Sequence, residues 1–289
     1  MTILKKDILI NHLVMNFRSK SLLITGGAGF IGSNFINYLF NKYNNIKVVN
    51  LDLLTYAGDL DNLKSVEDNS RYKFIQGNIN DKNLVENIFN EYQIDGVINF
   101  AAESHVDNSI TNPEIFINTN INGVFNLLNC AFNYWMDNPF KVKKKFRMAR
   151  FHQISTDEVY GSILKGSFDE DSRYSPNSPY SASKASADMI VRSFHKTYGL
   201  NTTISVCSNN YGPNQNKEKL IPKIIDCLIN NKSIPIFGDG MNVRNWIYVD
   251  DHCQAVDVLF NNAKSGSIYN IASKNELTNI CLLYTSDAA

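Results

Sequence analysis

Short apolar runs bounded by turn residues alternate along the chain with longer segments whose apolar residues recur at helical spacing. The runs predict strands at Ser21–Thr25, Lys47–Leu51, Lys73–Gln76, Gly96–Ala102, Phe151–Ser155 and Thr202–Cys207. The longer segments predict helices near Ser33–Lys42, Pro113–Asn133 and Tyr180–Tyr198. Alternating strands and helices indicate an α/β fold, a doubly wound parallel sheet of Rossmann type with helices on both faces.

The pattern changes after Pro213. A helix is predicted at Leu220–Asn230, strands at Ile234–Phe237, Trp246–Val249 and Ile268–Ile271, and a turn at Gly238–Gly240. We interpret this part as a smaller, incomplete C-terminal substrate lobe that closes over the carboxyl edge of the sheet, where open α/β sheets bind ligands. The predicted division is an extension over 1–17, a dinucleotide-binding domain over 18–208, the lobe over 209–280 with a return to the main sheet near 243–255, and a tail over 281–289.

Composition excludes several classes of function. The 289 residues are 44% hydrophobic and 19% charged, and 28 basic residues balance 28 acidic ones, so no global basic field attracts nucleic acid or an anionic membrane. We interpret the basic run Lys141–Arg150 as a solvated loop rather than a nucleic-acid patch. No run approaches the ~18 apolar residues of a membrane helix. Five scattered cysteines without a CxxC indicate reduced thiols in a cytoplasmic protein, with no zinc or other metal site.

Both ends of the chain look unusual. A second methionine, Met15, stands just before the first strand, so we expect residues 1–14 to be a start-site artefact or a loose arm. The last residues, CLLYTSDAA, look like the translation of a transposon-end sequencing adapter. The expectation is therefore that the natural chain was cut near Ile280; the alternative is a genuine short strand and tail.

The first predicted strand runs into a glycine-rich turn that suits a phosphate. Gly26 permits the tight turn, Gly29 lets the backbone approach a pyrophosphate, and Gly32 lets the helix pack closely on the sheet. The helix N-terminus then offers free N–H groups to the anion. Asp52 follows Gly32 by twenty residues, at the end of the second strand, where a carboxylate accepts hydrogen bonds from ribose hydroxyls. The pattern favours NAD over NADP; the alternative is a plain helix cap or turn.

Two further groups of residues suit proton transfer. Tyr180 and Lys184 lie one helical turn apart, and an ammonium beside a phenol lowers the pKa of the phenol. Thr156, Asp157 and Glu158 follow the fifth strand, where Thr156 can donate to a substrate oxygen. If both acids point into the cleft, burial and mutual repulsion keep one protonated, which supplies a general acid and a general base. The alternative is an exposed acidic turn.

At this point the chain resembles a known family. TGGAGFIGS and the Tyr180/Lys184 pair resemble the extended short-chain dehydrogenase/reductase family of nucleotide-sugar enzymes. LDLLTYAGDLDNL, FAAESHVDNSI, ISTDEVYGS, CSNNYGP and EKLIPKII narrow the resemblance to the dTDP-glucose 4,6-dehydratase family, over about residues 19–280. The adjacent Asp and Glu are its most specific feature, because related epimerases usually lack the pair and GDP-mannose dehydratases keep only the Glu.

The resemblance implies an NAD-dependent lyase that converts dTDP-glucose to dTDP-4-keto-6-deoxy-glucose. It implies that Tyr180, helped by Thr156 and Lys184, takes the proton of the 4-hydroxyl while hydride passes from C4 to NAD. It further implies that Glu158 takes the C5 proton, that Asp157 protonates the leaving C6 hydroxyl, and that hydride then returns at C6 while a proton is added at C5. A homodimer is a further implication of the family.

The resemblance also implies the contact residues. Cofactor contacts are expected from Gly26, Gly29, Phe30, Ile31, Gly32, Asp52, Leu53, Thr55, Asn78, Ile79, Ala101, Ala102, Thr119, Tyr180, Lys184 and Asn210. Substrate contacts are expected from Ser104, Thr156, Asn209, Lys219, Leu220, Pro235, Phe237, Arg244 and Asn279, with Arg244 as the diphosphate clamp. Leu53 stands where the family often has Lys and Asn78 where it often has Asp, so affinity for the cofactor can differ.

Alternatives remain open from the sequence. One alternative is that the chain is a truncated NAD-binding fragment without turnover. Another is that it is a different nucleotide-sugar epimerase, decarboxylase or dehydratase of the same fold. Glu103, His105 and Asp107 suggest a catalytic or metal cluster at first sight. Because side chains in an extended segment alternate between two sides, we interpret these three as loop-shaping residues beside the cofactor.

Overall fold

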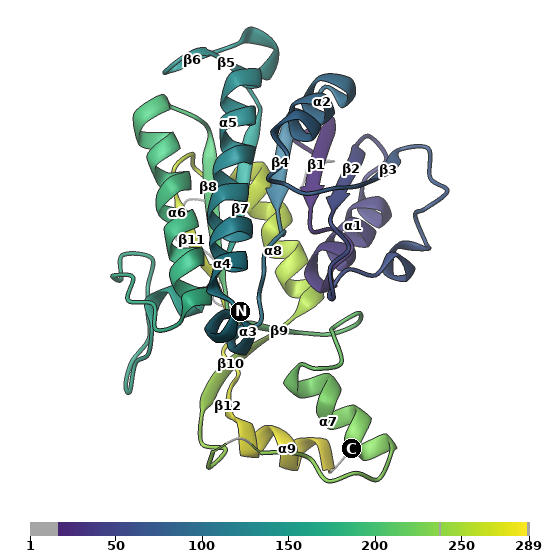
Figure 1. Cartoon of the computed structure of the whole chain (residues 1–289), viewed down its shortest axis with the longest axis vertical. Coiled ribbons are helices and arrows are strands. Elements are labelled where there is room, and N and C mark those ends of the chain that lie inside the picture. Colours follow the sequence, from purple (N-terminus) through teal and green to yellow (C-terminus); the bar gives the residue numbers. More distant parts are fainter. Residues whose placement is uncertain (1–16, 237, 288–289) are drawn as a thin grey trace.

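The computed structural model describes residues 17–236 and 238–287. A seven-stranded parallel sheet forms its centre, in the order β11-β8-β7-β4-β1-β2-β3 (Figure 1). Its strands are β1 (Ser21–Thr25), β2 (Lys47–Asp52), β3 (Tyr72–Gln76), β4 (Gly96–Asn99), β7 (Arg150–Thr156), β8 (Thr202–Cys207) and β11 (Ile268–Ile271). All neighbouring pairs are parallel, and the strand order reverses between β1 and β4. The predicted doubly wound fold is therefore confirmed.

Helices cover both faces of this sheet. The helices α2 (Lys82–Tyr92), α5 (Val124–Trp135) and α6 (Pro179–Tyr198) pack their apolar side chains on one face, while α1 (Phe30–Lys42) and α8 (Val249–Asn262) cover the other. Strands covered on two faces have no solvent side, which explains why the three central residues of β1 are all apolar and the strand is buried throughout. The sheet edge that carries the carboxyl ends of the strands is left open for a ligand.

Phe17 belongs to the folded domain rather than to an N-terminal extension. Its ring is 3% exposed, stacks on Phe260 of α8 at a centroid distance of 5.2 Å and meets the edge of Tyr43. The backbone N–H of Arg18 donates to Asn261 on the same helix. The predicted boundary at residue 17 is therefore wrong at its last residue, and the expectation for residues 1–14 lies outside the described residues.

A second, smaller lobe lies below the carboxyl ends of the strands in Figure 1. It contains a three-stranded sheet of β9 (Asn209–Tyr211), β10 (Val243–Tyr248) and β12 (Glu276–Thr278), with α7 (Leu220–Ile229) and α9 (Asn279–Asp287). The chain returns to the large domain through α8, which packs against α1 and β8. The turn at 238–240 is present. The exact division into domains stays a prediction.

Three sequence predictions for this lobe need correction. Residues 234–236 form no strand, because no neighbouring strand pairs with them; residue 237 lies outside the described residues. Strand β11 exists as predicted, but it pairs with β8 and so extends the main sheet instead of the lobe. Residues 281–287 form most of α9, not a strand and tail.

The predicted helix over Pro113–Asn133 is interrupted. It consists of α4 (Pro113–Phe116), a π-helical segment η2 (Ile117–Gly123) and α5. Within η2, the buried amide of Asn120 donates to Glu103 O at 3.0 Å and to Ser183 Oγ at 2.8 Å, which ties this segment to two walls of the cavity described below. The wider helical turn aims a polar side chain inward, as π-helical segments at ligand sites often do.

Several short elements were not anticipated. These are α3 (Val106–Thr111), the hairpin β5 (Met136–Asn138) and β6 (Lys141–Val142), and the 3-10 turns η1 (Leu60–Leu63), η3 (Lys144–Phe146) and η4 (Asp157–Tyr160). The lysines of the basic run are not buried, as expected of a solvated segment. Arg150 is the exception: it is 2% exposed and donates to the carbonyls of Leu259, Phe260 and Ala263 at the end of α8.

Across residues 17–236 and 238–287, none of the helices combines the length and apolar character needed to cross a bilayer. Cys130, Cys207, Cys227 and Cys253 are buried thiols.

Candidate active site

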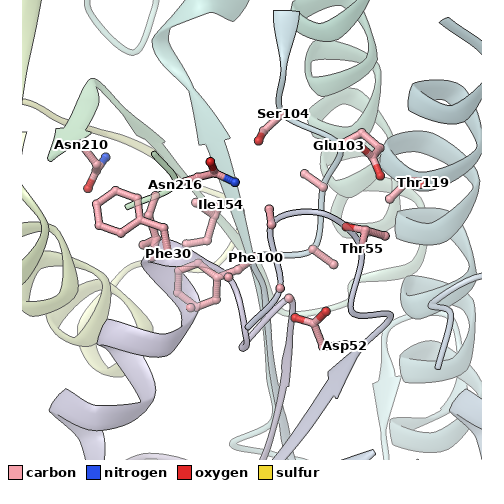
Figure 2. Close-up of a pocket in the computed structure, with 18 of the residues that line it drawn as sticks. Phe30, Asp52, Thr55, Phe100, Glu103, Ser104, Thr119, Ile154, Asn210 and Asn216 are labelled. Atoms are coloured by element: carbon pink, nitrogen blue, oxygen red, sulfur yellow. The ribbon is translucent and has the colours of Figure 1, made fainter. Parts of the chain in front are cut away.

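One cavity of about 720 Å³ lies at the carboxyl ends of β1, β2, β4, β7 and β8. Every residue expected to contact the cofactor lines it: Gly26, Gly29, Phe30, Ile31, Gly32, Asp52, Leu53, Thr55, Asn78, Ile79, Ala101, Ala102, Thr119, Tyr180, Lys184 and Asn210. Figure 2 shows Phe30 and Asn210 on one side of this cavity and Thr55 and Thr119 on the opposite side. The cavity spans the point where the strand order reverses, which is where this fold binds ligands.

The glycine turn is shaped as the sequence predicts. Gly26 has φ +68°, and a Cβ there would lie 2.6 Å from the backbone nitrogen of Ala101. A Cβ on Gly32 would lie 2.3 Å from the carbonyl oxygen of Gly26, so only glycine allows α1 to pack this closely. Gly29 differs, because the nearest atom to its Cβ position is 3.4 Å away and the position borders the cavity. Gly29 is also the N-cap of α1 and supplies no side-chain acceptor, so the first N–H groups of the helix remain available to an anion.

Asp52 shapes the turn as well as lining the cavity. Its Oδ2 accepts from Ala28 N at 2.9 Å and its Oδ1 from Leu54 N at 2.8 Å. Each carboxylate oxygen has a second lone pair, so the group can still accept from a ligand hydroxyl. Asp52 thus forms the turn, as the alternative interpretation of the sequence expects, and its carboxylate also lines the cavity.

Helix α6 brings Tyr180 and Lys184 to the cavity wall. Ser178 and Ser181 form a reciprocal capping box at its N-terminus, with Pro179 in the first turn, so the helix begins at a defined residue. Tyr180 is 9% exposed, and the ammonium of Lys184 donates to the carbonyl oxygen of Ile154 at 2.6 Å. Helix α6 is thereby fastened to the end of β7.

The protein groups together raise the pKa of Tyr180, contrary to the expectation of a net lowering beside Lys184. Burial raises the pKa of Tyr180 far above its ordinary value, and the nearby Glu158 carboxylate raises it further. A hydrogen bond with Thr156 acts in the opposite direction. Lys184 is engaged with a backbone carbonyl, and its own pKa is lowered by burial. Deprotonation of this phenol therefore needs additional positive charge or a proton acceptor from the ligand.

Both acids of the turn η4 face the same cavity as the phenol. Thr156 is the N-cap of this turn: its hydroxyl accepts from Glu158 N and donates to Asp157 Oδ1, both at 3.4 Å. Burial raises the pKa of Asp157 to about 6. Burial and then the Asp157 charge raise the pKa of Glu158. The reading of these residues as an exposed acidic turn is therefore wrong, and mutual repulsion acts in the direction the sequence predicts.

The expected substrate contacts divide into two groups. Ser104, Thr156, Asn209 and Lys219 line the cavity. Leu220, Pro235, Arg244 and Asn279 do not line it, although Asn209 and Lys219 of the same smaller lobe do, and Phe237 lies outside the described residues. Arg244 is exposed on β10, yet its positive charge lowers the pKa values of Asp157 and Glu158, so it lies within electrostatic reach of both acids.

Further residues line the cavity; of these, Lys219 was an expected substrate contact and Glu103 was expected beside the cofactor, whereas Tyr56, Cys207 and residues 214–218 were not anticipated. Burial raises the pKa of the Glu103 carboxyl group. His105 caps α3 and lies 3.7 Å from Glu218, consistent with a loop-shaping role. Loop residues such as these carry no periodicity, so only a motif would have revealed them.

The chain is similar to known proteins over most of its length. The family model described as GDP-mannose 4,6 dehydratase matches residues 23–287. The dTDP-glucose 4,6-dehydratase of Xanthomonas campestris pv. campestris is 48% identical over 259 residues, which are 89% of this chain and 72% of that protein.

Two solved structures share the fold and most of the chain. The dTDP-glucose 4,6-dehydratase of Bacillus anthracis, in complex with NAD, is 43% identical with a TM-score of 0.81 and covers 91% of this chain and 79% of that one. The dTDP-glucose 4,6-dehydratase of Streptomyces venezuelae, with NAD and TYD bound, is 42% identical with a TM-score of 0.85, covering 93% and 81%.

The raised pKa of Asp157 predicts a pH-dependent gain in stability when that charge is removed. Asp157 has a pKa of about 6 in the folded protein, whereas the ordinary pKa of an aspartate is 3.8. The folded chain therefore keeps the Asp157 proton at pH values where the unfolded chain has lost it, and the free energy of unfolding falls as pH rises between 3.8 and about 6. The free energy of unfolding of Asp157→Asn should therefore exceed that of the parent chain by about 1–3 kcal/mol at pH 7.5, since each pKa unit corresponds to about 1.4 kcal/mol.

Urea unfolding at pH 7.5 and pH 5 measures this difference, which should shrink at the lower pH. Asp68→Asn, on an exposed aspartate, is the matched control and should change little at either pH. An Asp157→Asn variant that gains the same stability at both pH values, or none, would contradict the role of burial.

Proposed function

This chain belongs to the GDP-mannose 4,6 dehydratase family, and we propose from its similarity to dTDP-glucose 4,6-dehydratases that it converts dTDP-glucose to dTDP-4-keto-6-deoxy-glucose and water. The observation that carries the proposal is that Tyr180, Asp157 and Glu158 line one cavity. Loss of water across C5 and C6 needs a base and an acid in addition to the group that serves C4. An epimerase needs no such pair, and the adjacent Asp and Glu favour dTDP-glucose over GDP-mannose as substrate.

The cavity fits NAD. The uncapped N-terminus of α1 and the open position at Gly29 suit a pyrophosphate, and Asp52 suits a ribose diol while repelling a 2′-phosphate. Leu53 and Asn78 line the same part of the cavity and are expected to alter affinity rather than chemistry. When bound, NAD supplies a positively charged ring that would accept a hydride from C4 of the sugar and return it to C6.

Each protein group has a distinct proton to move. Tyr180 takes the proton of the C4 hydroxyl, with the Thr156 hydroxyl beside it and Lys184 in the same cavity wall. Glu158 takes the proton from C5, which the C4 carbonyl makes acidic. Asp157 donates a proton to the C6 hydroxyl, and water leaves. The resulting C5–C6 double bond is reduced when C6 receives the hydride and C5 regains a proton. A pKa of about 6 suits Asp157 to this task, because a proton held near neutral pH is readily given up.

The conversion assay tests the proposal and both carboxylate roles. Incubated with NAD and dTDP-glucose, the chain should form a 4-keto-6-deoxy sugar, which absorbs in alkali. Glu158→Gln and Asp157→Asn should each lower the rate by about 10²–10⁴, the usual contribution of one general acid or base. Formation of a 4-epimer would favour an epimerase, and NAD binding without turnover would favour the fragment without activity.

A substrate analogue separates the two acids. Fluoride in place of the C6 hydroxyl leaves without a proton, so dTDP-6-deoxy-6-fluoro-glucose should restore most of the rate of Asp157→Asn. The same analogue should not rescue Glu158→Gln, because the C5 proton must still be removed. Equal rescue of both variants, or rescue of Glu158→Gln alone, would mean that the assigned roles are wrong.

Two glycines give a matched test of the dinucleotide site. Gly29→Ala places a methyl group at the open position, so it should weaken NAD binding at least tenfold in calorimetric titration and leave urea unfolding unchanged. Gly32→Ala forces a methyl group against Gly26 O and should lower the free energy of unfolding by about 1–3 kcal/mol. Parent-like NAD affinity in Gly29→Ala would contradict the proposed position of the pyrophosphate.

The proposal extends to a cytoplasmic homodimer. Buried thiols suit a reducing compartment. Exposed apolar side chains on adjacent elements suit a partner: Ile117 on η2, Phe125 on α5 and Met189 on α6 (Figure 1). Light scattering should give twice the chain mass, and Phe125→Asp should give the chain mass while the control Leu164→Asp stays dimeric. A monomeric parent chain would contradict this arrangement.

A further inference from the structure

A third ionisable side chain continues the row formed by the phenol and the lysine. Tyr180, Lys184 and Asp188 follow one another at four-residue spacing, so they lie along one face of α6. Burial increases along the row, from 9% exposed at Tyr180 to 5% at Lys184 and 0% at Asp188. Asp188 does not line the cavity and lies behind the two groups that do.

The Asp188 carboxylate joins three chain segments. Its Oδ2 accepts from Ser155 Oγ, at the end of β7, at 2.5 Å, and from the Tyr174 hydroxyl, in the segment before α6, at 3.2 Å. Its Oδ1 is buried and has no hydrogen-bond partner in the part of the chain that the structure describes. Ser155 directly precedes Thr156, so these contacts hold the acid-bearing turn in register with the catalytic helix.

A buried carboxylate with an unsatisfied oxygen is costly unless a positive charge lies nearby. Lys184 supplies that charge. Burial lowers the pKa of Lys184 and would favour the neutral amine, and the Asp188 carboxylate is the largest influence that raises it. Their coupling acts through the protein interior, because the lysine ammonium itself donates to Ile154 O.

We infer that Asp188 is a positioning residue: its buried carboxylate keeps Lys184 charged and ties the end of β7 to α6. The inference rests on the proposed function, because it explains how the lysine retains the charge that favours the phenolate. Asp188 touches neither substrate nor cofactor in this account. It acts through Lys184 and through Ser155.

Other ionisable groups face this carboxylate without replacing it. Tyr160 and Tyr174 have pKa values raised by burial and by Asp188, so both stay neutral. Arg192 influences Tyr174 from the next turn of α6. On the side of β8, Cys207 faces Lys184, but burial raises the pKa of its thiol to about 12, so it is neutral as well. The carboxylate of Asp188 is thus the anion that faces Lys184 near neutral pH, and since its own pKa is about 6 this charge is lost in acid.

The titration of Lys184 measures this role without any need for turnover. The full chain is labelled with lysine carrying ¹³C at the ε position, and the Lys184 signal is assigned by its loss in Lys184→Arg. In Asp188→Asn the pKa of Lys184 should fall by about one pH unit or more, the usual effect of removing a nearby opposite charge.

A second buried carboxylate provides the matched control. Asp257 on α8 is 1% exposed and accepts hydrogen bonds from Tyr38 and Tyr43, so Asp257→Asn also removes a buried cross-linking charge. It lies outside the cavity wall and should leave the titration of Lys184 unchanged. If Asp188→Asn does not fold, Tyr174→Phe takes its place. Loss of the Tyr174 hydrogen bond raises the pKa of Asp188, so Asp188 is protonated at a higher pH than in the parent chain. The change in the Lys184 signal that accompanies protonation of Asp188 should move to higher pH with it.

The outcomes distinguish this inference from the proposed function. An unchanged Lys184 titration in Asp188→Asn, or in Tyr174→Phe where that variant is used, would overturn the positioning role even if the parent chain converts dTDP-glucose. A lowered Lys184 pKa in Asp188→Asn, together with no conversion of dTDP-glucose by the parent chain, would support the positioning role and contradict the proposed function. A similar shift in Asp257→Asn would mean that loss of any buried charge disturbs the site, which would also overturn the inference.

Discussion

Parallel pairing of β1 with β4, and of β4 with β7, brings three chemically different segments to one edge of the sheet. The first pairing places the glycine turn beside Ala101 and Ala102. The second places the acid-bearing turn η4 on the next strand along. Because carboxyl ends of parallel strands share an edge, an anion site and a proton-transfer site become neighbours without any contact between their side chains.

Ionisable groups at that edge are buried, and burial determines their behaviour. It raises the pKa values of Tyr180, Asp157 and Glu158, so each group tends to hold its proton. For Asp157 this is useful in a proton donor, whereas for Tyr180 it is an obstacle to a base. Positive charge from Lys184, itself dependent on Asp188, and from NAD when bound acts against that obstacle. The site is therefore a set of opposed electrostatic influences rather than a collection of independent residues.

Local signals in the sequence predicted the sheet and the dinucleotide site well. Apolar runs between turns define β1 and β8 to the residue, and the glycines have their predicted geometry. Long-range pairing was harder, because nothing within Ile268–Ile271 says that its partner is β8. The π-helical segment depends on the contacts of Asn120, and the burial of Phe17 depends on Phe260, which lies far along the chain.

The chemistry was partly predictable for the same reason. Motif spacing identified Tyr180, Lys184, Asp157 and Glu158, but the direction of a pKa depends on burial, which spacing does not reveal. Asp188 lies four residues after Lys184 in the sequence, but spacing alone gave no reason to select it. Its importance emerges only when Ser155 and Tyr174 are seen to meet it.

The central claim is that one cavity holds a single hexose while hydrogen leaves C4 and returns at C6. Conversion of dTDP-glucose deuterated at C4 tests this most directly. The account predicts that the product carries that deuterium at C6 of the same molecule. Deuterium lost to water, found at C6 of a different molecule in a mixed-substrate experiment, or retained at C4 would contradict it.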